Sequence, residues 1–89
     1  MRAIITVTGK DKTGIIAGVS AALSTLGINI LDISQTVLQE YFAMIMLVDL
    51  ENSKVPFAQI SDNLAETGKD ICMDIRIMRE EIFNAMHRI

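Results

Sequence analysis

Nine residues near the middle of the chain, 42–50 with the sequence FAMIMLVDL, are apolar at all but one position. A run of this length without polar periodicity favours a β-strand over an amphipathic helix. Successive side chains of a strand point to opposite faces, so Phe42, Met44 and Met46 fall on one face, and Ala43 and Ile45 fall on the other. A strand that is apolar on both faces needs both faces covered. Helices can cover one face, and the other then needs a further helix or a second subunit.

The flanking sequence supplies strands and helices in an order that can provide this cover. The expected elements are, in chain order, a strand over 3–8, a helix over 15–26, a strand over 28–39, the strand over 42–50, a helix from Pro56 closed by Gly68, a strand over 71–78, and a short helix from Arg79 to the end. The order βαββαβ is that of the ferredoxin-like split βαβ fold. We therefore expect an α+β sandwich with a four-stranded antiparallel sheet and two helices on one face. The short C-terminal helix can cover the other face.

Three local features of this scheme are specific enough to test. Thr13 suits the N-cap of the first helix, and Gly27 suits the position just beyond its C-terminus. The strand over 28–39 has no cleanly polar face, and a bulge that exchanges its faces partway is an open alternative. We expect a single domain over residues 1–78, extended by the helix of residues 79–89.

Composition excludes several classes of function. The net charge is −3 and the pI is near 4.9, which argues against a nucleic-acid module. A single cysteine, Cys72, excludes an internal disulfide and a cysteine-rich metal site. No signal peptide or run of ~18 apolar residues is present, so we expect a cytoplasmic protein with no membrane partner. The hydrophobic fraction of 51% exceeds what one small core hides, which favours a subunit interface.

The residue types that carry catalysis are mostly missing. The only histidine is His87, three residues from the end, and no histidine or cysteine spacing suits a transition metal. We therefore expect no enzymatic activity, no cofactor and no metal. An acylphosphatase-like enzyme is a less favoured alternative, because the loop after the first strand carries Lys10 and Lys12 but no arginine. A base-stacking RNA-binding surface is also disfavoured, because Tyr41 and Phe42 are adjacent and face opposite sides of the strand.

The entrance of the first helix is the remaining candidate site. Gly9 and Gly14 permit a tight turn and close backbone approach. The first backbone N–H groups of the helix, from Gly14 to Ile16, have no helical partner and carry the positive end of the helix dipole. A carboxylate would be stabilised there, with Asn29 contacting the rest of a small ligand. Spacing alone favours the ordinary alternative, a capped turn followed by an asparagine that begins a strand.

The residues around this helix resemble the ACT domain. The pattern G-x-D-x-x-G-I-I followed by L-x-x-x-G-I-N-I is carried here by Gly9, Asp11, Gly14, Ile15, Ile16, Leu23, Gly27, Ile28, Asn29 and Ile30. The resemblance covers nearly the whole chain, because βαββαβ is also the ACT topology. It is greatest to small stand-alone ACT proteins and to ACT modules of the glycine-cleavage-repressor type.

The resemblance implies a regulatory module that binds an amino acid or similar metabolite at a subunit interface. By position, the implied ligand loop consists of Asp11, Lys12, Thr13, Gly14, Ile15 and Ile16, with Asn29 and Ile30 opposite. ACT domains commonly pair side by side through the first helix and second strand, which implies a homodimer. Since no catalytic or DNA-binding domain is fused to the sequence, an allosteric output would pass through a partner protein. A ligand-free interaction module is the alternative hypothesis.

Overall fold

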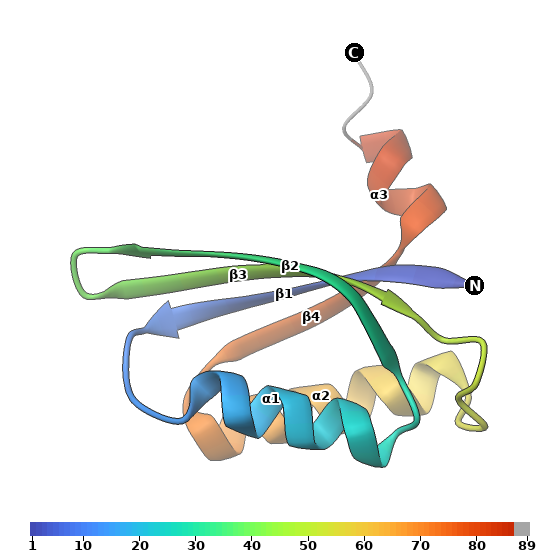
Figure 1. The fold of residues 1–89 in the computed structure, drawn as a ribbon, viewed down its shortest axis with the longest axis horizontal. Helices are drawn as coiled ribbons and strands as arrows, with labels where there is room; N and C mark the ends of the chain where they lie inside the picture. The colour runs from blue at the N-terminus through green and yellow to red at the C-terminus, as the bar shows by residue number, and fades with distance from the viewer. Residues whose placement is uncertain (87–89) are drawn as a thin grey trace.

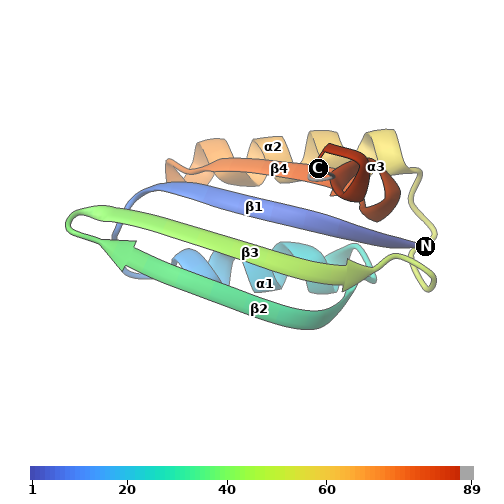
Figure 2. The same ribbon diagram turned by 90° about the horizontal axis from the view of Figure 1, so that it is seen from above.

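The computed structural model describes residues 1–86. Its elements are β1 (Arg2–Lys10), α1 (Ile15–Thr25), β2 (Asn29–Leu38), β3 (Tyr41–Asp49), α2 (Phe57–Ile71), β4 (Asp74–Arg79) and α3 (Glu80–Met86). The four strands form one antiparallel sheet in the order β2-β3-β1-β4. Helices α1 and α2 lie side by side on one face of this sheet (Figures 1 and 2). The predicted ferredoxin-like βαββαβ sandwich with a short C-terminal helix is therefore confirmed.

The core lies between the sheet and the two helices. In β3, Met44 and Met46 are at most 1% exposed, and Met46 is aligned with Ile5 of β1. From the helices, Leu23 and Leu64 are equally buried. The opposite side chains of β3 are more open, since Ile45 is 48% exposed. The sheet therefore has a covered face toward the helices and a second, largely uncovered face.

A β-bulge interrupts β2 at Leu31 and explains why neither face of this strand is cleanly polar. Ile30 pairs with Val48, and the register then shifts so that Ile33 pairs with Met46. Residues aligned across a sheet share a face, so Ile30 and Ile33 both point toward the helices although they are three positions apart. The bulge that sequence left as an alternative is thus present.

The C-terminal ends of the two long helices differ from each other. Gly27 (φ 73°) lies just beyond α1, where the N–H of Ile28 donates to the carbonyl oxygen of Leu23 at 3.0 Å, as expected for a Schellman motif. Gly68 was predicted to close α2, which is wrong, because the helix continues to Ile71 and Cys72 takes the left-handed conformation (φ 58°). A β-carbon on Gly68 would lie 2.5 Å from the carbonyl oxygen of Met73. Gly68 therefore allows β4 to pack closely on α2.

Helix α3 rises from one corner of the sheet, on the side away from α1 and α2 (Figure 1). Among the described residues, its main contacts are with β1 and β4, and Arg2 of β1 forms an ion pair with Glu80 at its start. Much of the open face of the sheet therefore remains uncovered by this helix (Figure 2). His87 and the remainder of the predicted C-terminal helix lie outside the described residues. In the part of the chain up to residue 86, every helix is too short or too polar to cross a membrane.

Candidate functional site

The loop between β1 and α1 is anchored at its start by the neighbouring hairpin. The backbone N–H of Asp11 donates to the carbonyl oxygen of Glu40, in the turn between β2 and β3, with an N···O distance of 2.7 Å. The side chains of the next two residues, Lys12 and Thr13, are exposed. This single bond fixes where the chain leaves the sheet and so positions the beginning of α1.

Gly14, rather than Thr13, is the N-cap of α1. Gly14 has φ 87°, and no side chain caps the helix, so the prediction of a Thr13 cap is wrong. A residue with a β-carbon rarely adopts this left-handed conformation. A β-carbon placed on Gly14 would meet nothing within 4 Å. The glycine is therefore required by backbone geometry, and the space in front of the helix entrance is open.

The first turn of α1 offers unused donors to that open space. The first helical hydrogen bond runs from the N–H of Gly18 to the carbonyl oxygen of Gly14 at 2.9 Å. The N–H groups of Ile15, Ile16 and Ala17 precede it and have no helical acceptor. The first turn contains no acidic side chain that would neutralise the positive end of the helix dipole. An anionic group is the natural complement of this entrance.

The two isoleucines of the predicted ligand loop have different surroundings. The side chain of Ile15 is buried in the core at 3% exposed, whereas that of Ile16 is 42% exposed. Ile15 can therefore offer a ligand only its backbone, and Ile16 can offer an apolar side chain as well. The sequence pattern alone does not distinguish these two positions.

Asn29 and Ile30 lie at the opposite end of α1 from Gly14. The helix runs away from its entrance for 11 residues, which corresponds to about 16 Å, and β2 begins only after it ends (Figure 1). Asn29 is exposed and aligned with Asp49, while Ile30 packs against the core. A single protomer therefore does not bring Asn29 to the helix entrance.

A strip of exposed apolar side chains runs along the side of the molecule formed by α1 and the edge strand β2. It consists of Ile16, Leu31, Ile33 and Val37, which are 40–51% exposed. Ile33 and Val37 are aligned with the buried Met46 and Phe42, so they belong to the helix-bearing face. They are exposed at the edge of the sheet, because β2 has a neighbouring strand on one side only. We call this strip the α1/β2 edge; sequence suggested it only through the mixed pattern of the strand.

Two other glycines near the helix entrance, Gly9 of the motif and Gly18 of α1, have a packing role. A β-carbon on Gly9 would lie 2.7 Å from the Sδ atom of Met73, and one on Gly18 would lie 3.3 Å from the Cγ2 atom of Ile71. Gly9 thus makes room for the turn that leads into β4, and Gly18 makes room for α2. Within residues 1–86, no group of three or more His, Cys, Asp or Glu side chains is arranged to hold a metal ion.

Comparison with known proteins agrees with this fold and motif. The family model of the ACT domain matches residues 2–78. A UPF0237 protein of Clostridium acetobutylicum is 58% identical over 89 residues, which is the full length of both chains. The structure of an ACT domain protein from Streptococcus pneumoniae superimposes with a TM-score of 0.84 at 47% identity, over 98% of each chain.

A more distant structure shows the same fold. A protein assigned as a glycine cleavage system transcriptional repressor superimposes with a TM-score of 0.72 over 86% of this chain and 44% of that one, at 23% identity. An identity this low is evidence for the fold alone. The family model and the full-length relatives go further, and they show that this chain belongs to the ACT domain family and, within it, to the UPF0237 proteins.

Proposed function

We propose that this protein is a regulatory domain that binds an amino acid at the entrance of α1, in a homodimer, and passes the signal to a partner protein. ACT domains are in general regulatory ligand-binding domains. The observation that carries the proposal is the uncapped helix entrance at Gly14, which faces open space. An amino acid supplies the carboxylate that such an entrance binds.

Charge around the entrance is compatible with a carboxylate. Lys10 and Lys12 flank Asp11 in the same short segment, and all three are exposed. The segment therefore carries a net positive charge in a protein whose total charge is −3. Together with the dipole of α1, this local excess favours an anion over a cation.

Homodimerisation through the α1/β2 edge would complete the site. β2 is an edge strand with unpaired backbone groups, and exposed apolar side chains accompany it. A two-fold axis that pairs β2 with its copy runs the two strands antiparallel. The first residue of one β2 then lies beside the end of the other protomer where α1 begins. Asn29 of one protomer thereby approaches Gly14 of its partner.

In such a dimer, each site combines two kinds of contact. The N–H groups of the α1 entrance hold the carboxylate, and the amide of Asn29 from the other protomer can donate to or accept from the rest of the ligand. Binding then stabilises the dimer as well as the fold, because both protomers contact the same molecule. This coupling between ligand and assembly is the signal that a partner protein would recognise.

A thermal-shift screen of the twenty amino acids tests the proposal. A ligand at 100 times its Kd stabilises the native state by about 2.7 kcal/mol, which corresponds to a rise in Tm of more than about 10 °C for a domain of this size. We expect a rise with one or a few amino acids, and its loss in Asn29→Ala. Asn63→Ala, which removes an exposed amide on α2, is the matched control and should keep the full rise.

The alternative, a ligand-free interaction module, makes the opposite prediction. A stable dimer whose Tm responds to none of the amino acids would contradict the sensing proposal. A full rise in Asn29→Ala would instead remove Asn29 from the site while leaving the helix entrance as the binding element.

A further inference from the structure

The uncovered side of the sheet has an apolar centre. Ile4 of β1 is aligned with Leu47 of β3, and Ile45 lies two residues before Leu47 on the same face of β3, which points away from α1 and α2. Ile45 is 48% exposed. We call the side of the sheet that bears them the open sheet face. It is separate from the α1/β2 edge, where Ile33 and Val37 point to the opposite side.

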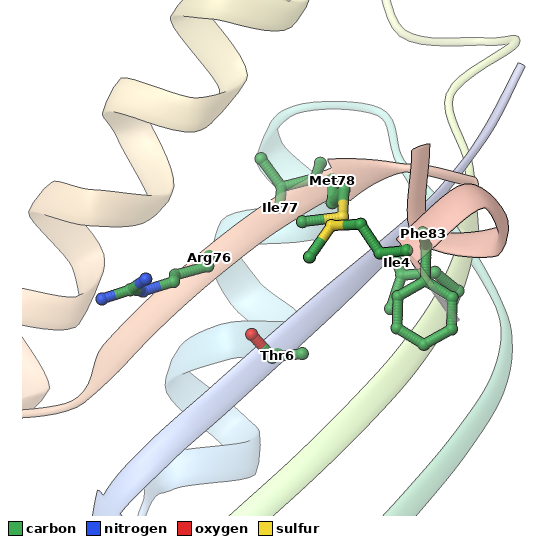
Figure 3. Close-up of a pocket in the computed structure, with 7 residues that line it drawn as sticks. Ile4, Thr6, Arg76, Ile77, Met78 and Phe83 are labelled. Atoms are coloured by element: carbon green, nitrogen blue, oxygen red, sulfur yellow. The ribbon is translucent and has the colours of Figure 1, made fainter. Parts of the chain in front are cut away.

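Two shallow hollows join across this face at Ile4. One lies between the sheet and α3 and has a volume of about 240 Å³; it is lined by Ile4, Thr6, Arg76, Ile77, Met78, Phe83 and Met86. In Figure 3, the ring of Phe83 lies beside Ile4, and Arg76 points away from both. The second hollow includes Ile4, Ile45 and Leu47 and reaches Asp32 of β2. The two hollows share Ile4, and the apolar centre of the face has Asp32 on its β2 side and the Asp74–Arg76 pair on its β4 side.

The dimensions of the face match a protein interface better than a small ligand. Four strands spaced ~4.8 Å apart and about nine residues long form a face of roughly 19 × 30 Å. Its flat area is on the order of 600 Å², without the additional surface of protruding side chains. A standard interface buries about 800 Å² on each partner, and the exposed flank of α3, with Ile82 and Met86, adds to the available area. Two such sheets pack face to face at a spacing of ~10 Å.

The charges at the two sides of the face identify a complementary occupant. Asp32 lies on β2 and Arg76 on β4, the two edge strands, and both belong to the open face through their alignment with Leu47 and Thr6. Arg76 is bonded to Asp74 at 3.1 Å, but its side chain is 78% exposed. An exposed pair of this kind contributes little, and a guanidinium has five donors. Arg76 therefore keeps the capacity to bind a second carboxylate.

We propose that a second copy of this chain packs on the open sheet face, sheet against sheet, about a two-fold axis parallel to the strands. This axis places β2 of one copy opposite β4 of the other. Asp32 is level with Met78 across the sheet, so it lies two residues along β4, about 7 Å, from Arg76 of the other copy, a distance that the long arginine side chain spans on both sides of the interface. An axis perpendicular to the strands would instead place the acidic side opposite its own copy. In the favoured arrangement, α3 of each copy flanks β2 of the other. This interface is additional to the α1/β2 edge, so that the two together join more than two copies.

Mass measurement in solution tests the proposal. Multi-angle light scattering after size-exclusion chromatography should give the wild-type chain twice the mass of Ile45→Asp, since a buried carboxylate at the centre of the interface prevents packing. Ala58→Asp adds the same charge at an exposed position of α2 and should keep the wild-type mass. Circular dichroism establishes that Ile45→Asp is folded. An unchanged mass in Ile45→Asp, or a wild-type chain no larger than the variant at high concentration, would overturn the proposal.

A charge exchange tests the arrangement without relying on the apolar centre. Asp32→Arg should weaken association at least tenfold, and Asp32→Arg combined with Arg76→Glu should restore it, because the pair is then reversed but complementary. Failure of the double variant to recover would overturn the pairing of β2 with β4. Ile16→Asp acts on the α1/β2 edge instead. If Ile16→Asp and Ile45→Asp each lower the measured mass independently, the two interfaces are separate. Failure of one interface can then be distinguished from failure of the other.

Discussion

Gly14 and Asn29 lie at opposite ends of α1, although the ACT pattern places them in one motif. The helix that separates them has 11 residues and is about 16 Å long. A ligand the size of an amino acid cannot touch both within one protomer. If both contribute to one site, each site must be shared between two copies of the chain.

Mixed dimers therefore provide the first prediction. Gly14→Val and Asn29→Ala should each abolish the thermal shift produced by the amino acid that is active in the screen. In a mixed dimer of these two variants, one site carries both defects and the other carries neither. After refolding the variants together, we expect about one site in four to bind in calorimetry. No recovery in a sample shown to contain mixed dimers would indicate that the two residues do not share a site.

A second prediction concerns the conformation of Gly14 itself. Gly14→Ala should lower the free energy of unfolding by about 1–2 kcal/mol, because alanine is strained at φ 87° although it meets no neighbour. Gly14→Asn should lose less, since asparagine tolerates the left-handed region better. Urea denaturation of both variants provides the comparison. Equal losses in the two variants would contradict backbone strain as the cause.

The close approach of α2 and β4 gives a third prediction. Alanine at Gly68 would place a β-carbon 2.5 Å from the carbonyl oxygen of Met73, whereas alanine at Gly9 would meet the Sδ atom of the same residue at 2.7 Å. A flexible thioether can move, but the backbone carbonyl of Met73, immediately before β4, cannot move without shifting the start of that strand. The nearest backbone atom to a β-carbon on Gly9, the carbonyl oxygen of Cys72, is 3.3 Å away and needs a smaller shift. We expect a loss of about 2 kcal/mol or more for Gly68→Ala and a smaller loss for Gly9→Ala, measured by denaturant unfolding. A larger loss for Gly9→Ala than for Gly68→Ala would show that the start of β4 shifts more easily than the Met73 side chain.

The pairing of Arg2 with Glu80 gives a fourth prediction. The hydrogen bond and the charge of Glu80 raise the pKa of Arg2 above its usual value. Because the pKa of Arg2 is raised in the folded state, the stabilisation from the Arg2–Glu80 pair is fully present below the ordinary arginine pKa. It is lost only as the pH rises through the raised pKa, so the pair does not respond to ordinary alkaline conditions. Salt should weaken it instead. Glu80→Gln should increase hydrogen exchange in residues 80–86 and leave the Tm nearly unchanged, whereas Glu81→Gln should leave both the exchange and the Tm unchanged.

Local pattern was sufficient for most of the fold. The apolar run at 42–50 correctly indicated a strand: Met44 and Met46 are buried under the helices, whereas Ile45 is exposed on the open face. The left-handed glycine at Gly27 was also predictable, because a Schellman motif is a property of a few consecutive residues. These features depend on periodicity and turn chemistry, which the sequence contains directly.

Features that depend on contacts between distant elements were not predictable in the same way. Gly68 has the sequence appearance of a helix terminator, but it is a packing residue, and Cys72 takes the terminating conformation instead. The direction of α3 depends on its contacts with β1 and β4, which no local pattern encodes. The separation of Gly14 from Asn29 became visible only when the length and direction of α1 were known.

The hydrogen bond from Asp11 to Glu40 has a consequence for how a signal leaves the helix entrance. It ties the start of the entrance loop to the turn that ends β2, and β2 is the strand that a neighbouring subunit would meet. A shift of the loop on one side of this bond is therefore a shift of the hairpin tip on the other. A ligand-driven change at the entrance would therefore reach the outer strand through one backbone hydrogen bond, without passing through the core.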